Sequence, residues 1–165
     1  MGLIINQKIQ ELMKGYPTVS DKYNVAPAVL AGSTNVNFGD AVTFSSTNGY
    51  FEAITTSLAD ANAVAGFVVA TNVKLATGFP GTEPQVKPGE AFGLLVNGFM
   101  AIELDSGATL ASATANSPVH VILATGKMTT VDKYNAGTIV PLANCVFTGV
   151  TELQGTKKIA EIYVK

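Results

Sequence analysis

Alternating apolar and polar residues run through most of the chain and predict β-strands. The clearest stretch is residues 92–104, where every second side chain on one face is apolar, apart from a glycine: Leu94, Val96, Gly98, Met100, Ile102 and Leu104. The Asn97-Gly98 pair inside it usually favours a hairpin. Because the alternation continues unbroken across this pair, we instead predict one long strand that bends at Gly98.

Other segments carry the same β signature. Asn48-Gly49 is typical of a tight hairpin turn and lies between two apolar stretches, 42–45 and 50–54. Residues 65–73 are apolar without alternation, which favours a central strand buried on both faces. Further strands are expected at 119–124, 145–150 and 158–164. Strands at this spacing, separated by turn residues, predict a mainly β protein built as a small β-barrel or sandwich.

The first 27 residues follow a different pattern. Apolar residues at helical spacing predict one short helix over residues 5–14, which Gly15 and Pro17 end. This stretch is too short to form its own core and too apolar to remain in water. We therefore divide the chain into an N-terminal arm, residues 1–27, and a β-barrel domain, residues 28–165. The arm is expected to bury its apolar side chains either on its own barrel or on a neighbouring subunit.

Residues 76–89 interrupt the β pattern. They contain three prolines and three glycines, so they predict a long loop. A loop of this length inside a small domain is usually functional or mobile.

Composition narrows the possible functions. Charged residues are 13% of the chain, against about 25% in typical soluble domains. All ten basic residues are lysines and the net charge is −2, which argues against direct binding of nucleic acid. The apolar run over residues 63–70 is too short to cross a bilayer. The first ten residues do not resemble a signal peptide, so synthesis in the cytoplasm is expected.

Residues that could carry chemistry are few. One cysteine and one histidine cannot build an internal disulfide or a usual zinc site, so we expect no metal and no cofactor. His120 alternates with Val119 and Val121 and is expected to be a partly exposed strand residue. Cys145 is expected to pack as a small apolar side chain. Glu103 and Asp105 are expected to flank a solvated turn. The chain is therefore not expected to be an enzyme, and its uncharged surface favours a structural role.

Four segments together resemble a known family. They are residues 27–32 (PAVLAG), 38–42 (FGDAV), 65–69 (AGFVV) and 88–102 (PGEAFGLLVNGFMAI). In this order and at this spacing they are similar to the capsid cement, or head decoration, proteins of tailed bacteriophages. The resemblance covers about residues 25–165.

The resemblance implies a structural virion protein on the outside of the capsid. It would associate with itself as a homodimer or homotrimer, bind the major capsid protein, and cement neighbouring capsomers of the DNA-filled head. The arm would then supply the contacts with the capsid or with other copies, through Leu3, Ile4, Ile5, Ile9, Leu12, Met13, Tyr16 and Tyr23. The predicted loop would supply further contacts, through Phe79, Pro80, Glu83 and Lys87.

Two other readings remain open at this level. A carbohydrate- or receptor-binding barrel of a virion surface would use exposed aromatic side chains, and the candidates are Tyr50, Phe51, Phe79 and Phe99. The lack of tryptophan counts against it. A tail-tube or pilin-like subunit would form rings or fibres by itself.

Overall fold

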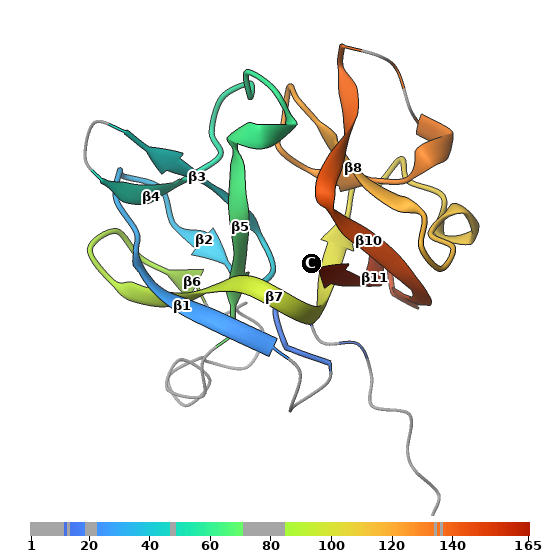
Figure 1. Ribbon diagram of the computed structural model, residues 1–165, viewed down its shortest axis with the longest axis horizontal. Coiled ribbons are helices and arrows are strands. Elements are labelled where there is room, and N and C mark those ends of the chain that lie inside the picture. The colour runs from blue at the N-terminus through green and yellow to red at the C-terminus, as the bar shows by residue number, and fades with distance from the viewer. Residues whose placement is uncertain are drawn as a thin grey trace, which may run out of the picture.

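The structure of the chain is a computed structural model, and it describes residues 12, 14–18, 23–46, 49–70, 85–133, 135 and 137–165. These residues form one nine-stranded sheet and one two-stranded sheet (Figure 1). The strands are β1 (Tyr23–Val29), β2 (Val36–Asn37), β3 (Ala41–Ser45), β4 (Tyr50–Ala53), β5 (Val64–Val69), β6 (Gln85–Val86), β7 (Ala91–Leu104), β8 (Pro118–Ile122), β9 (Met128–Thr129), β10 (Ile139–Gln154) and β11 (Lys157–Val164).

Helical structure within the described residues is limited to three single turns, η1 (Ala61–Ala63), η2 (Leu110–Ser112) and η3 (Val131–Lys133). None of the helices in this part of the chain has the length and apolar character needed to cross a membrane. The prediction of a mainly β fold is confirmed.

The long strand β7 organises the molecule. It runs without interruption through Asn97-Gly98, as the alternation predicted. Its first half pairs with β1 on one side and β5 on the other, and its second half pairs with β11, from Val164↔Gly98 to Lys158↔Leu104. The change of partner occurs at Gly98, which has φ 126, so the bend and the change of pairing coincide. In Figure 1, β7 lies below both halves of the molecule.

The second half of β7 belongs to a closed β-barrel. Starting from β7, the hydrogen-bonded order is β11, β10, β8 and β9, and β9 returns to β7 through the parallel pair Leu104↔Met128. The interior is filled by alternate residues of these strands, among them Met100, Ile102 and Ile162, all 0% exposed. Because every strand has a neighbour on both sides, this ring has no open edge.

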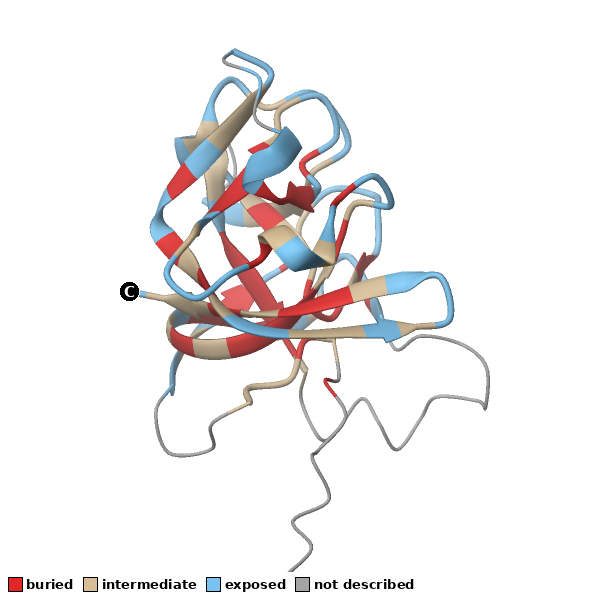
Figure 2. Ribbon diagram, turned by 90° about the vertical axis from the view of Figure 1, so that its right-hand side faces the viewer, coloured by how far each residue is buried: buried red, intermediate tan, exposed pale blue. Residues whose placement is uncertain are grey.

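The first half of β7 belongs to what we call the N-terminal half: β1 to β6 with residues 91–97 of β7. Here the ring is closed, among the described residues, by a single bridge between Leu30 and Phe51. Its core is separate and includes Leu30, Val42, Val68 and Leu94. Adjacent residues of β7 point into the two cores, with Leu94 in one and Leu95 in the other. Figure 2 shows buried residues along the strands of both halves.

Several local predictions can now be compared with the structure. β3 and β4 form the expected hairpin, with Ser45 opposite Tyr50. β5 lies between β3 and β7, as expected for a central strand. The segment expected to be a loop contains β6, which pairs with β2 and buries Val86 against Val36. β10 extends well beyond the predicted residues 145–150. Its pairing with β8 shifts register between Pro141 and Val146, so the sequence lacks the regular alternation there that predicts a strand.

The predicted arm is described only in part. The helix expected over residues 5–14 lies mostly outside the described residues. β1 begins at Tyr23 and crosses the boundary placed after residue 27, since it pairs with β7 along its whole length. The division of the chain into arm and barrel domain stays a prediction.

Candidate functional site

The base of the arm runs antiparallel along one edge of β7, where Pro17 forms a bridge with Met100. We call Leu12 and residues 14–18 the arm root. Three backbone hydrogen bonds attach it to β7: Gly15 N–H to the Ala101 carbonyl at 2.8 Å, Ala101 N–H to the Tyr16 carbonyl at 3.2 Å, and Thr18 N–H to the Phe99 carbonyl at 3.2 Å. The described residues of the arm root therefore contact their own chain, whereas the position of residues 1–11 stays a prediction.

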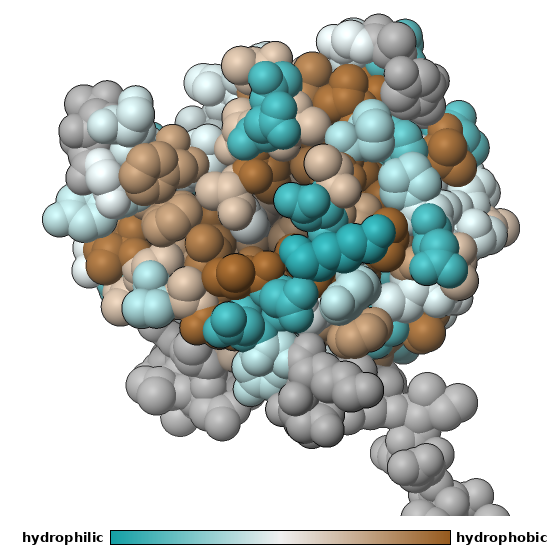
Figure 3. Space-filling view, in the orientation of Figure 1, coloured by the Kyte–Doolittle hydropathy of each residue, from teal (hydrophilic) through white to brown (hydrophobic). Residues whose placement is uncertain are grey.

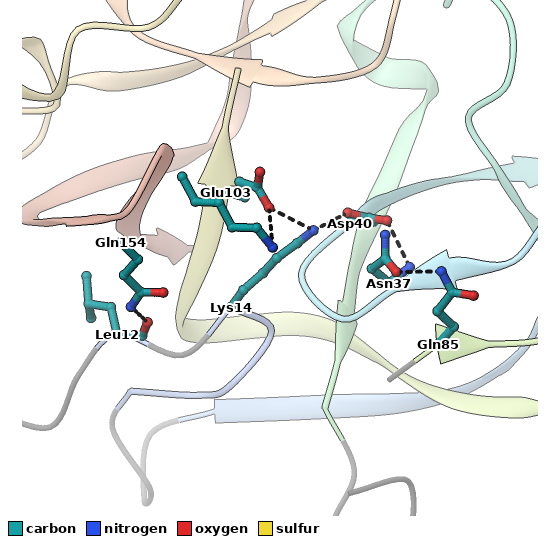
Figure 4. Close-up of polar contacts among 8 residues, drawn as sticks. Leu12, Lys14, Asn37, Asp40, Gln85, Glu103 and Gln154 are labelled. Atoms are coloured by element: carbon teal, nitrogen blue, oxygen red, sulfur yellow. Dashed lines mark hydrogen bonds and ion pairs between the residues drawn. The ribbon is translucent and has the colours of Figure 1, made fainter. Parts of the chain in front are cut away.

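Leu12 is the apolar anchor of the arm root. Its side chain is 8% exposed and packs against Ala101 of β7 and Ile159 of β11. The tip of β10 holds its backbone, because Leu12 N–H donates to Glu152 Oε2 at 2.8 Å. Gln154 Nε2 also donates to the Leu12 carbonyl, at 2.6 Å (Figure 4). Leu12 was predicted to contact the capsid or another copy, but in this structure it is buried within its own chain.

Lys14 joins the arm root to both halves of the molecule. Its Nζ lies 2.9 Å from Asp40 Oδ1, in the turn before β3, and 3.4 Å from Glu103 Oε2 on β7 (Figure 4). Lys157 Nζ approaches the same Glu103 oxygen at 4.0 Å. The Lys14 side chain is 17% exposed, so water screens these pairs only in part. Asp40 Oδ2 also accepts from Asn37 N–H at 2.8 Å, so the same carboxylate stabilises the turn before β3.

A close approach of two backbone segments fixes the position of the arm root. Gly15 has φ +80, and a Cβ added there would lie 2.4 Å from Phe38 Cβ. Only glycine fits at this contact. The Gly15 carbonyl also accepts from Ala70 N–H at 2.7 Å, at the end of β5. The arm root and residue 70, just before the predicted loop, are therefore neighbours in space.

Two hydroxyl groups of the arm root have unused hydrogen-bonding capacity. Tyr16 Oη and Thr18 Oγ1 are buried and have no hydrogen-bond partner among the described residues. Burial raises the pKa of Tyr16. A buried polar atom without a partner is unfavourable by about 1–3 kcal/mol, so these two hydroxyl groups offset part of the stability that the other contacts give the arm root.

A cavity of about 430 Å³ lies beside the arm root, between the two halves of the molecule. Its walls include Lys14, Asp40 and Ile54 from one side, and Glu103 and Lys127 from the other. The two carboxylates are already engaged by Lys14. The cavity is therefore a polar seam between the two halves.

The remaining predicted contact residues are only partly placed. Tyr23 is 45% exposed at the start of β1, and Tyr16 is half-buried. Lys87 is exposed, and its N–H donates to Glu90 Oε2 at 2.7 Å. The others lie outside the described residues: Leu3, Ile4, Ile5, Ile9, Met13, Phe79, Pro80 and Glu83.

The two residues considered for catalysis, His120 and Cys145, are buried and do not line the cavity beside the arm root. His120 was expected to be partly exposed, and this is wrong: it is 3% exposed, because both faces of β8 are covered. Burial lowers the pKa of His120, while the Pro118 carbonyl, 3.1 Å from its Nδ1, opposes this effect. Cys145 is 3% exposed and burial raises its pKa to about 12, so it is the packed, unreactive side chain that was predicted.

Acidic residues do not form a metal site in the described part of the chain, where no three His, Cys, Asp or Glu side chains come together. Asp105 Oδ1 accepts from Gly107 N–H in the solvated turn, as expected, whereas Glu103 faces Lys14. Two of the aromatic residues suggested for sugar binding are packed against other rings. Phe51 lies against Phe92, and Phe99 stacks on Tyr163 with ring centres 4.6 Å apart. Tyr50 is 49% exposed.

Sequence reasoning missed the residues that hold the arm root. Lys14, Glu152 and Gln154 act across 26 to 142 positions of sequence separation, and no local pattern marks such contacts. The exposure of Phe44 was also missed. It lies two residues after the buried Val42 on β3, where alternation predicts burial, yet it is 53% exposed.

Comparison with known proteins finds a family and a solved structure that are similar to this chain. Residues 5–165 match the model of a family described as "Structural cement protein (E217 gp24/Pam3 gp6)". A solved structure entitled "The capsid of Myoviridae Phage XM1" contains a chain with the same fold, at a TM-score of 0.65 and 18% sequence identity, covering 99% of this chain and 96% of that one. No curated protein sequence matches significantly.

Proposed function

Since the chain belongs to the family of phage structural cement proteins, and is thus a structural protein of the virion, we propose that it binds the outer surface of the capsid and cements neighbouring capsomers. The partner in this proposal is the major capsid protein. The protein acts by binding, with no catalytic step, and as a homodimer or homotrimer.

The observation that carries this proposal is the fixed arm root. Four sets of interactions hold it: the Leu12 contacts, the Lys14 ion pairs, the hydrogen bonds to β7, and the close approach at Gly15. A segment attached this firmly leaves the barrel at a defined point. The residues before it then need to lose less freedom when they bind a partner.

The chain before the arm root has the composition of a binding segment. Residues 3–5 are Leu-Ile-Ile, and Ile9 follows. Burying such side chains stabilises a complex by about 25 cal/mol per Å² of apolar surface, less the entropy lost on ordering. We propose that Leu3, Ile4, Ile5 and Ile9 contact the capsid or an adjacent copy, and that Leu12 holds the arm in place within its own chain.

The predicted loop is a second contact in this proposal. Phe79, Pro80, Glu83 and Lys87 lie in it or at its end. Support comes from Ala70, which bonds to the arm root just before the loop begins. Two contact segments that start from one place can engage one capsid subunit together, which multiplies weak contacts.

The experiment that tests the arm compares two proteins on expanded heads that lack the cement protein. One is the full chain and the other lacks residues 1–11, so that the arm root stays intact. The shortened protein is expected to unfold at the same temperature as the full chain and to bind heads at least 10-fold more weakly by co-sedimentation.

A matched control carries Leu3→Ser and Ile5→Ser in the full-length arm. It should lose most of the same affinity, because the apolar side chains and not the length are responsible. If the shortened chain saturates heads at the same concentration as the full chain, the arm does not bind the capsid.

A further inference from the structure

The direction in which the arm leaves the body of the protein affects how tightly it can bind. Binding through residues 1–11, on which this inference rests, is tighter when the arm is already aimed, because an aimed segment loses less freedom on binding. Leu12 is the first described residue and directly follows this segment. The contacts of Leu12 therefore set the direction of the arm.

Two side chains of β10 hold both polar groups of the Leu12 backbone. Glu152 Oε2 accepts from Leu12 N–H at 2.8 Å, and Gln154 Nε2 donates to the Leu12 carbonyl at 2.6 Å. Because they are two residues apart on one strand, both side chains lie on the same face of β10. We call Glu152 and Gln154 the arm clamp. It binds the backbone on either side of one Cα atom, so it fixes the orientation of the chain there.

The part of the β10–β11 hairpin that carries the arm clamp is bent relative to the rest of β10. We call this part, residues 151–160, the hairpin tip. Between Phe147 and Thr151, β10 has three residues where β11 has only Glu161. Such a bulge bends a strand and turns the side chains beyond it to a new direction. Thr148 Oγ1 donates to Glu161 Oε2 at 2.6 Å across the bulge, which stabilises the bend.

The hairpin tip is also held from its other face. Lys158 pairs with Leu153, so both lie on the face away from the arm clamp. Lys158 Nζ donates to the carbonyls of Ser106 and Ala108, each at 2.6 Å. β11 in addition pairs with β7 from Lys158 onward. The arm clamp is therefore held in place by contacts that do not involve the arm.

The surface of the hairpin tip favours a supporting role over direct contact with a partner. Leu153 is 62% exposed but lies alone between the two polar clamp residues. In Figure 3 hydrophobic and hydrophilic residues are mixed at the lower right, where the β10–β11 hairpin of Figure 1 turns. A single exposed leucine in a mixed surface is ordinary and does not indicate an interface.

We propose that Glu152 and Gln154 are positioning residues for binding of the capsid. They act through the Leu12 backbone, which they hold in one orientation, so that residues 1–11 leave the protein at a fixed angle before they meet the capsid. The arm contacts the capsid and the clamp does not. The contribution of the clamp to affinity therefore depends on the presence of residues 1–11.

The test uses variants that change the polar groups and keep the size of the side chains. Glu152→Met with Gln154→Met removes both bonds to Leu12. Glu152→Gln removes the charge but keeps an oxygen that can accept from Leu12 N–H. Leu153→Ser is the matched control on the other face of the hairpin tip. Each is made in the full chain and in the chain that lacks residues 1–11, and binding to cement-free heads is measured by co-sedimentation.

The double variant of the full chain is expected to bind roughly 3- to 10-fold more weakly, the effect of one or two further residues that must be ordered on binding. In the chain that lacks residues 1–11, the same double variant should cause no further loss. Glu152→Gln and Leu153→Ser should bind as the full chain does. A direct capsid contact or a general loss of stability would instead weaken the full and the shortened chain equally.

A second measurement follows the arm in the free protein. A nitroxide spin label on Gln10→Cys reports the mobility of the arm by electron paramagnetic resonance. The label is selective, because Cys145 is 3% exposed and burial raises its pKa to about 12. The double variant should increase the mobility of the label, whereas Glu152→Gln should leave it unchanged.

Three outcomes would overturn the proposal: unchanged label mobility in the double variant, an equal loss of affinity with and without residues 1–11, and a loss in Leu153→Ser as large as in the double variant. The proposed function is tested separately. If deletion of residues 1–11 weakens binding and the double variant does not, the clamp has no positioning role and the proposed function stands. If the deletion has no effect, the proposed function fails, and the role of the clamp fails with it.

Discussion

The two halves of the molecule use the same strand β7 in different ways. In the closed barrel, seven consecutive residue pairs join β7 to β11, and the ring has no open edge. In the N-terminal half, the described residues complete the ring through a bridge between Leu30 and Phe51, and the exposed aromatic residues of the hairpin lie beside it. The difference fits the division of work that we propose, in which the closed barrel supplies rigidity and the N-terminal half, with the arm root, presents the binding surfaces.

The largest expected effect comes from opening a cavity in each core. Ile102→Ala, in the closed barrel at 0% exposure, should lower the free energy of unfolding by about 3–5 kcal/mol. Leu30→Ala, at 1% exposure in the N-terminal half, should lower it by about 2–3 kcal/mol, because a less constrained ring can collapse onto the cavity. Chemical denaturation measures both. Equal losses would show that the two halves are equally rigid.

A side chain at Gly15 should detach the arm root while leaving the barrel folded. Gly15→Val forces a Cβ into Phe38 at a positive φ, which should cost about 1–3 kcal/mol locally. Amide hydrogen exchange should then speed up at Ala70 and Ala101, which bond to the arm root. Gly155→Ala is the control, since it also has positive φ but nothing within 4 Å of the added Cβ. The prediction fails if both variants leave exchange at Ala70 and Ala101 unchanged.

Acid should weaken the closed barrel through His120. Its pKa is lower in the folded state than the ordinary value near 6.5, so below that pH the unfolded chain binds a proton more readily. Stability should therefore be constant above pH 7 and fall as the pH drops below about 6.5, by at most about 1.4 kcal/mol per pH unit. Urea midpoints between pH 5 and 8 measure this. His120→Gln should remove the part of the slope between pH 5 and 6.5, and an unchanged slope would contradict the assignment.

The smallest expected effect is that of the Lys14 ion pairs. Lys14→Ala should lower the free energy of unfolding by about 1 kcal/mol or less, because its partners are about one-third exposed. Lys133→Ala, on η3, provides the comparison in the closed barrel. The difference between the two should shrink as salt rises from 50 to 500 mM, roughly as screening predicts. A difference that does not depend on salt would mean that Lys14 acts through packing of its chain.

The sequence predicted local features of the fold well and long-range ones poorly. The uninterrupted alternation over residues 92–104 and the Asn48-Gly49 hairpin signal each lie within a few positions. The long strand and the pairing of β3 with β4 are confirmed, while Asn48 itself lies outside the described residues. Closure of the barrel depends on pairing such as Val164↔Gly98, for which no local signal exists. The predicted exposure of His120 was wrong because alternation shows which face of a strand a residue lies on, and not whether other elements cover that face.

The candidate site was predictable in its apolar part only. The spacing of apolar residues suggested Leu12 as a contact, and its burial shows that it does make one, but within its own chain. The network of Lys14, Asp40 and Glu103 joins three segments distant in sequence, so it could not be predicted. Exposed aromatic residues such as Phe44 follow the same pattern as buried ones, and only the structure separates them.

The division of work can be tested directly by hydrogen exchange of the protein free in solution and bound to expanded heads. The account predicts new protection on binding at residues 1–11 and in the predicted loop, residues 76–89, with no change over β8 and β9 of the closed barrel. New protection confined to β8 and β9, with none in the loop or in residues 1–11, would contradict it.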